Sequence, residues 1–423
     1  SNNTAVGYAA LLLNTTGANN VAVGYRALDA NTTASSNVAV GNAALGATTT
    51  GAQNTATGVS ALFSNTTGSQ NTTSGLNSLY YNTTGTNNAA FGVGALQSNT
   101  TSSNNVAIGH STLLSNTTGA YNTAVGALAG DAITTASYNV ALGYEALTVD
   151  TLGGNSVAIG AFALRDQNFT SATNAYNVGI GYEAGGSITT GTNNTIIGGL
   201  SGDAITTGSN NTTLGYVALG NTTTGASNVA VGYAAGLAST TASNNVSIGT
   251  QAAQTGTTGA SNVAIGKEAL YSNVTISNST AVGFQALQAA TNGPNTAVGS
   301  QALTDVTTGY DNTAVGRNAG KLVTTGIRNS AFGDLAFDAN TTGSYNTALG
   351  AYSLGANTTA DNNTAVGYSA LLANTTGASN VAVGSSVMTG NTTGQRNVAV
   401  GYLAFDAANT GSYSVAVGYS ALG

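Results

Sequence analysis

Three glutamates are the side chains with the clearest capacity for acid and base chemistry. Glu145, Glu183 and Glu268 share one position of a repeating pattern, and paired carboxylates are the usual catalysts of glycoside hydrolysis. On a regular stack of strands, Glu145 and Glu183 would lie about 9 to 10 Å apart, close to the separation of an inverting pair. Nothing around them predicts the burial that would raise the pKa of a general acid. We therefore expect no enzymatic activity and no catalytic residues.

His110 is the only histidine, and the chain contains no cysteine. It stands where other repeats carry Tyr, Asn, Lys, Arg or Ser, which indicates an exposed surface residue. One imidazole without thiolates or clustered acids cannot form a first-row metal site. We expect neither a metal nor another cofactor.

The composition argues against charged partners. Charged residues make up 5% of the chain, and the net charge of -7 comes from 14 scattered acids and 7 bases. Without a run of either sign, no patch for nucleic acid or an anionic membrane is predicted. No apolar run approaches the roughly 20 residues that span a bilayer, so we expect no membrane insertion by this segment.

A 17-residue repeat organises the whole chain. Aligning the Asn-Val-Ala-Val-Gly motifs on their glycine, called here the marker glycine (Gly7, Gly24, Gly41 and their equivalents), gives 25 coils. Such short units are typical of a solenoid, so we predict an all-β parallel β-solenoid forming one continuous domain over residues 1–423. Two register faults interrupt it: a loop insertion around 165–176 and a short step around 292–295, which holds the only proline.

The pattern of the repeat predicts which side chains fill the coil. Alternation in Val21-Ala22-Val23 is typical of a strand, and we expect the valines to face the interior and the small Ala and Gly side to approach another chain. Leu stands four residues after the marker glycine in 16 of 25 coils, and Gly in five. Four of those five gain Ile or Val three residues later, so both positions should share one interior.

Polar residues mark the remaining positions of the coil. Asn stands four before the marker glycine in 22 of 25 coils, which favours a hydrogen-bonded Asn ladder along the stack. Segments such as Asn14-Thr15-Thr16-Gly17 predict turns, with positive φ at the glycine.

Exposed aromatic side chains are the candidate contact residues. Tyr follows the marker glycine in many coils, where corner packing and a stripe for glycan or surface binding are both compatible with its chemistry. Phe169 lies within the insertion, either in a plain loop or at the tip of a ligand-contacting one. The candidate surface contacts are Phe169, Tyr25, Tyr144, Tyr182, Tyr216 and Tyr233.

The repeats resemble those of a known family of surface proteins. Residues 105–109 (Asn-Val-Ala-Ile-Gly) and 156–160 (Ser-Val-Ala-Ile-Gly) resemble the head repeat of the YadA-like trimeric autotransporter adhesins. The longer form at 363–371, followed by Asn374-Thr375-Thr376-Gly377, looks like repeats of phage tail fibres. The resemblance covers essentially the whole chain. It implies a left-handed β-roll, a homotrimeric rod and a role in attachment.

These observations favour a structural shaft or head of an extracellular trimeric fibre, at a cell surface or on a virion. Such a fibre would bind a host-surface glycan or protein receptor through many weak contacts. Three alternatives stay open: a filament subunit that self-assembles end to end through unpaired strand edges, an ice-binding solenoid using one Thr of each Thr-Thr pair, and a polysaccharide-cleaving fibre of the tailspike type.

Overall fold

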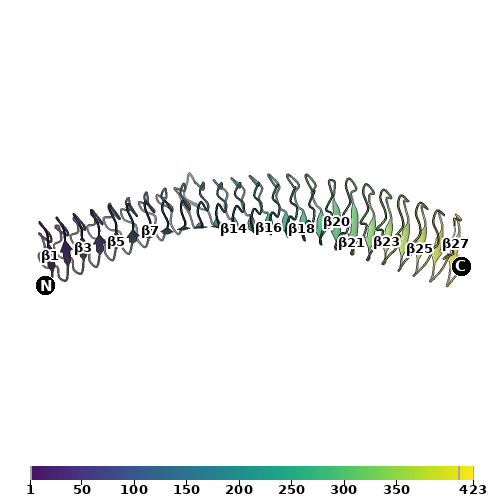
Figure 1. Ribbon diagram of the computed structural model, residues 1–423, viewed down its shortest axis with the longest axis horizontal. Helices are drawn as coiled ribbons and strands as arrows, with labels where there is room; N and C mark the ends of the chain where they lie inside the picture. Colours follow the sequence, from purple (N-terminus) through teal and green to yellow (C-terminus); the bar gives the residue numbers. More distant parts are fainter. Residues whose placement is uncertain (1, 408–409, 423) are drawn as a thin grey trace. The chain divides into compact units, whose positions relative to one another are not determined.

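The structure is a parallel β-solenoid. This computed structural model describes residues 2–407 and 410–422, and every regular element within them is a β-strand. Contacts divide the chain into two compact units, Ser1–Asn211 and Thr212–Gly423, which are described separately. Within each unit, strands of successive coils pair in parallel and lie side by side (Figure 1). The predicted all-β parallel solenoid is confirmed.

The main sheet of the first unit takes one three-residue strand from each coil. Its strands are β1 (Thr4–Val6), β2 (Val21–Val23), β3 (Val38–Val40), β4 (Thr55–Thr57), β5 (Thr72–Ser74), β6 (Ala89–Phe91), β7 (Val106–Ile108), β8 (Thr123–Val125), β9 (Val140–Leu142), β11 (Val157–Ile159), β13 (Val178–Ile180) and β14 (Thr195–Ile197). Two further strands, β10 (Gly153–Gly154) and β12 (Thr173–Asn174), form a separate parallel pair.

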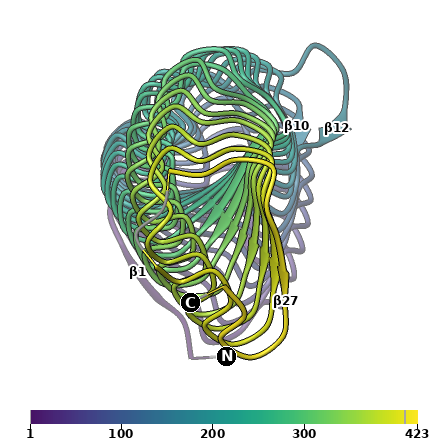
Figure 2. The ribbon, with the colours of Figure 1, turned by 90° about the vertical axis from the view of Figure 1, so that its right-hand side faces the viewer.

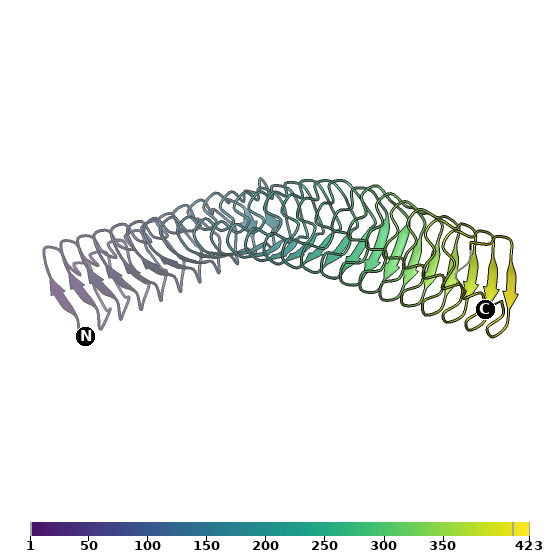
Figure 3. The same cartoon turned by 45° about the vertical axis from the view of Figure 1, so that its right-hand side comes forward.

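The second unit repeats this arrangement, with its strands along one side of the stack (Figure 3). Val282 pairs with Val298 across the short step, so the missing residue leaves the strand register unchanged. The strands are β15 (Thr212–Leu214), β16 (Val229–Val231), β17 (Val246–Ile248), β18 (Val263–Ile265), β19 (Thr280–Val282), β20 (Asn295–Val298), β21 (Asn312–Val315), β22 (Ser330–Phe332), β23 (Thr347–Leu349), β24 (Thr364–Val366), β25 (Val381–Val383), β26 (Val398–Val400) and β27 (Val415–Val417).

The two faces of each strand are the reverse of the prediction. The central Ala22 of β2 is fully buried, whereas the valines of the strands face outward, with Val40 of β3 37% exposed. The cause is the leucine of the opposite wall: a Cβ added at Gly179, which takes the central strand position in β13, would lie 2.8 Å from Leu164 Cγ. Leucine fills the thin interior, and only a small residue fits beneath it.

The marker glycines serve the stacking of coils within one chain, which corrects the expectation that they approach another chain. Gly24 has φ +139°, and a Cβ there would lie 2.4 Å from the carbonyl oxygen of Gly41 in the next coil. Both the backbone conformation and the contact exclude a side chain. The same geometry recurs at successive marker glycines.

The predicted exchange between Leu and Ile positions is confirmed. Gly130 takes the leucine position, and a Cβ there would lie 3.0 Å from Cδ1 of Ile133 and 3.1 Å from Cδ2 of Leu113. Ile133 is fully buried, so the two positions share one interior space. Leu28 has φ +53°, a left-handed conformation that glycine adopts without cost.

Asparagines form the predicted ladder, buried inside the coil. The backbone N–H of Asn37 donates to Oδ1 of Asn20 at 2.9 Å, and Nδ2 of Asn37 donates to the carbonyl of Gly51 at 3.0 Å. The turn prediction needs one correction. Gly17 lies outside the left-handed region, and positive φ falls instead on the residue before the ladder asparagine, such as Asn19 at +57°.

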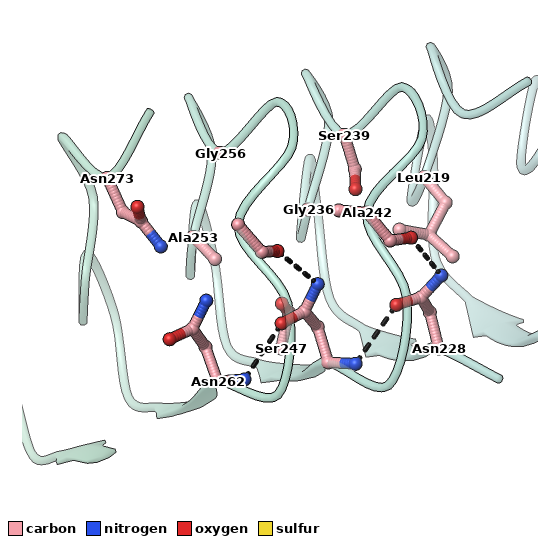
Figure 4. A pocket seen from close by; sticks show the side chains of 12 residues that line it. Leu219, Asn228, Gly236, Ser239, Ala242, Ser247, Ala253, Gly256, Asn262 and Asn273 are labelled. Atoms are coloured by element: carbon pink, nitrogen blue, oxygen red, sulfur yellow. Dashed lines mark hydrogen bonds between the residues drawn. The ribbon is translucent and has the colours of Figure 1, made fainter. Parts of the chain in front are cut away.

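One place in the second unit lacks the usual core side chains. Gly236 and Ser239 occupy the leucine and isoleucine positions of one coil, and Ala253 and Gly256 occupy them in the next. A cavity of about 20 Å³ lies between these coils, while the asparagine ladder passes beside it unbroken (Figure 4). A void of this size holds about one water molecule.

Candidate interaction surfaces

Outward side chains of the strands form an apolar stripe in each unit, called here the strand-face stripe. It consists of the residues directly before the marker glycines, most of which are Val, Ile, Leu or Phe. Ile108 is 42% exposed and Leu349 47% exposed. Large exposed apolar patches are uncommon on monomeric soluble proteins, so the strand-face stripe is a candidate interaction surface.

Tyrosines after the marker glycines line the neighbouring corner of the coil. They are between 48% and 77% exposed, so their rings lie on the surface instead of inside the corner. Tyr8 stacks on Tyr25 with ring centroids 5.4 Å apart, and Tyr216 stacks on Tyr233 at 6.2 Å. The row therefore presents amphipathic rings to solvent, and its role as a contact surface stays a prediction.

In the first unit, Tyr144 and Tyr182 belong to a longer aromatic run. Phe162 of the intervening coil lies edge-on to both, with centroids 5.4 Å and 5.9 Å away. The guanidinium of Arg165 lies 5.8 Å from the Phe162 ring centroid. Phe162 stands two residues after its marker glycine, whereas the tyrosines of the row follow theirs directly. Aligning the repeats therefore does not show that Phe162 belongs to the same aromatic run.

The acids beside this run form a surface network. Hydrogen bonds to Glu145 and Glu183 raise the pKa of Tyr144 and of Tyr182, respectively. Arg165 pairs with Asp166 at 2.9 Å, and both glutamates further raise its pKa. The two glutamates are partly exposed and lie near a guanidinium, an arrangement typical of ion pairing rather than of a buried general acid.

A second tyrosine row, five residues before the marker glycine, was missed by the sequence reasoning. It contains Tyr121, Tyr138, Tyr176, Tyr345 and Tyr413, all with positive φ and all exposed. Tyr121 and Tyr138 stack with centroids 5.1 Å apart and planes 1° from parallel. The signal in the sequence was weak because Asn, Ser and Gln take this position in other coils.

The insertion forms a longer loop, but Phe169 does not project from it. Phe169 is only 5% exposed, so the alternative that placed it at the tip of a ligand-contacting loop is wrong, and Phe169 offers no contact surface. Residues 170–172 and 174 are exposed, and the loop before β12 extends beyond the outline of its neighbouring coils (Figure 2). Phe169 packs against the turn of the preceding coil, where a Cβ on Gly153 would lie 2.7 Å from its ring.

A buried polar cluster anchors the start of the insertion. Asp150 and Gln167 stand seven residues after the marker glycine, where asparagines such as Asn14 and Asn31 form a second hydrogen-bonded row. Ser156 takes the place of asparagine in the ladder four residues before the marker glycine. Nε2 of Gln167 donates to Asp150 Oδ2 at 2.6 Å and to Ser156 Oγ at 3.0 Å. Nδ2 of Asn177 donates to Gln167 Oε1 at 2.8 Å. The longer glutamine thus spans the gap that the shorter serine leaves, and burial raises the pKa of Asp150.

The threonine pairs divide their two side chains between stacking and solvent. Thr32 donates its hydroxyl to the carbonyl of Thr49 in the next coil at 3.2 Å, whereas Thr33 is exposed. Only the second threonine of this pair belongs to an outward row.

The histidine, metal-binding clusters and membrane-spanning helices complete the search for functional groups. His110 is exposed, as predicted. Among the described residues, no group of three or more His, Cys, Asp or Glu side chains is arranged to hold a metal ion. A search of the same residues for a helix long and apolar enough to cross a membrane finds none.

Comparison with known proteins adds no family. No protein-family model and no curated protein sequence matches the chain. Its function must therefore be argued from its surfaces.

Proposed function

We propose that the chain is the shaft or head of an extracellular trimeric fibre, on a cell surface or a virion, that attaches through many weak contacts. The strand-face stripe carries this proposal. It is an apolar surface that the chain itself leaves uncovered over successive coils, and burying such a surface is the main driving force for association of chains.

The partner that best matches the stripe is a second and third copy of the same chain. The apolar side chains of the stripe recur once per coil, and each coil advances by one strand spacing of about 4.8 Å. Another copy of the chain carries apolar side chains at the same spacing, so the two stripes can pack together coil by coil. Closed symmetry with identical copies buries every stripe and leaves no apolar edge for further growth. In this arrangement the Val side, and not the Ala and Gly side, meets the neighbouring chains.

The outer surfaces of such a trimer would carry the aromatic rows and the exposed threonines. Each site of this kind is small, but three copies of many coils present them together. Simultaneous engagement of repeated weak sites raises the overall affinity of attachment without a deep pocket. The resemblance to adhesin and tail-fibre repeats supports the left-handed roll and the attachment role in the same proposal.

Single cysteines test which surface is covered. The chain has none of its own, so Val383→Cys places one thiol on the strand-face stripe and Thr376→Cys places one on an exposed turn. We expect a bulky maleimide to label the native Thr376→Cys variant rapidly and the native Val383→Cys variant slowly, with equal rates after unfolding. Equal rates in the native protein would refute coverage of the stripe.

A further inference from the structure

A hollow of about 470 Å³ lies beside the insertion in the first unit. The paired strands β10 and β12 contribute to it, together with the loop that projects in Figure 2. Its volume lies in the range of small-molecule sites, roughly 300 to 1,000 Å³. The side chains that give it chemical character are Tyr138, Tyr176, Asn155, Asn174, Thr135 and Ser137.

Two tyrosines flank the hollow with a gap between them. Tyr138, Asn155 and Tyr176 occupy the same position of three successive coils, with φ of +63°, +60° and +51°. Their strands β9, β11 and β13 pair without a register shift, so the two tyrosines stand about two strand spacings apart, roughly 9.5 Å. Tyr121, by contrast, is one coil from Tyr138 and stacks directly on it.

The gap has the dimensions for one ring. A flat group packed on both faces needs about 3.5 to 4.0 Å on each side, a total of about 7 to 8 Å that two strand spacings provide. Asn155 stands where a tyrosine would fill this space. The insertion adds a wall to the hollow, formed by the strand pair β10 and β12. No other coil among the described residues has such an additional pair.

Neutral hydrogen-bonding groups surround the gap. Nδ2 of Asn155 donates to Oδ1 of Asn174 at 2.9 Å, a bond that leaves the Asn155 Oδ1 as an acceptor and the Asn174 Nδ2 as a donor. Hydroxyls of Thr135 and Ser137 add to the rim, and none of the described residues that line the hollow is charged. An anionic ligand would therefore meet no cation, and a cationic ligand would meet no carboxylate.

We propose that this hollow, called here the Tyr138–Tyr176 site, binds a neutral saccharide with one pyranose ring between the two tyrosines. A pyranose has C–H groups on its faces, which pack on the negative faces of aromatic rings, and hydroxyls at its edge, which match amides and threonine hydroxyls. The assignment names a ligand class for the attachment function and rests on that proposed function. Binding at this site needs only one chain, however, so the saccharide site and the trimeric fibre are tested by different experiments.

Titration of the whole protein with defined sugars tests the site. The probes are neutral tetrasaccharides of glucose, galactose and N-acetylglucosamine, each added alone, and a sialylated form of the galactose probe. Binding is followed by saturation-transfer NMR and calorimetry. We expect at least one neutral probe to bind at millimolar or lower concentration, and sialylation to give no gain in affinity.

Three variants and a matched control locate the binding. Asparagine already takes this left-handed position in other coils, so Tyr138→Asn and Tyr176→Asn remove a ring without backbone strain. Loss of one stacking face should weaken binding about tenfold. Asn155→Tyr fills the gap and should abolish binding while keeping both tyrosines. Tyr81→Asn makes the same change at an exposed tyrosine that lies outside both tyrosine rows and should leave affinity unchanged.

Two outcomes overturn the assignment: no neutral probe binds at millimolar concentration, or the Tyr138, Tyr176 and Asn155 variants bind as tightly as Tyr81→Asn. A monomeric protein that binds sugar with the expected variant pattern would refute the trimer and keep this site. A trimer that binds none of the probes would do the opposite.

Discussion

Filling the small cavity of the second unit should stabilise the coils around it. Ser239→Ile restores the pairing of Gly with Ile that Gly130 and Ile133 show in a packed coil. The substitution should fit because the coil after Ser239 carries Ala253, whereas the coil after Ile133 carries the larger Leu147.

The expected gain follows from the size of the void. Burying the isoleucine side chain contributes about 2 kcal/mol. Removing a cavity of about 20 Å³ adds about 0.5 kcal/mol, and immobilising the side chain costs about 1 kcal/mol. The net gain is about 1.5 kcal/mol, roughly a tenfold change in a local opening equilibrium.

Hydrogen exchange reports this change where it occurs, because a solenoid opens locally as well as globally. The reporters are the backbone amides of Gly236 and Ala253, which donate to carbonyls of the following coil at 2.9 Å. Their exchange should slow about tenfold in Ser239→Ile. A series through Ser239→Ala and Ser239→Val should show protection rising with side-chain volume. Faster exchange in the Ile variant than in the Ala variant would refute the reasoning.

Three other perturbations test separate parts of the account. Gly232→Ala should destabilise its coil by at least about 2 to 3 kcal/mol, because φ is +129° and the new Cβ would lie 2.8 Å from the Gly249 backbone. Gly256→Ala is the control because Gly256 has no positive φ. Equal denaturation midpoints for the two variants would contradict this prediction. Burial raises the pKa of Asp150 above its ordinary 3.8, so the folded state binds the proton more tightly and this carboxyl reduces stability above the raised pKa. Local stability measured by hydrogen exchange should therefore increase as pH falls from about 7 toward the ordinary pKa of 3.8 relative to Asp150→Asn, and an opposite trend would be contrary to the assignment. Gln167→Ala should destabilise the insertion by about 1 to 3 kcal/mol, because it leaves Asp150 and Asn177 without their hydrogen bonds to Gln167. The control variant Gln70→Ala lies on an exposed surface and should change stability little. Equal urea midpoints for the two variants would count against the anchoring role of Gln167.

Much of the coil followed from local spacing alone. The 17-residue period places each strand and its partner. The replacement of the usual leucine by Gly130, with Ile133 in compensation, is visible within a few residues of sequence. The asparagine ladder was equally predictable, because a buried amide at one position of successive coils meets its equivalent at hydrogen-bonding distance.

The facing of the strands was not predictable from alternation. A period of two separates the sides of a strand but does not say which is inside, and the larger Val21 and Val23 suggested the wrong one. Leucine on the opposite wall decides the interior: Leu28 and Ala22 are both fully buried, and a Cβ at Gly179, in the central strand position, would lie 2.8 Å from Leu164 Cγ. The burial of Phe169 likewise depends on contacts with a neighbouring coil, which the order of residues in the insertion does not reveal.

The mass of the native protein in solution tests the central claim most directly, because the strand-face stripe is covered only if copies of the chain associate. Sedimentation equilibrium of this 41.1 kDa chain should give a species of three times that mass, stable on dilution into the nanomolar range. A single species of 41.1 kDa from nanomolar to micromolar concentration would contradict the trimeric fibre.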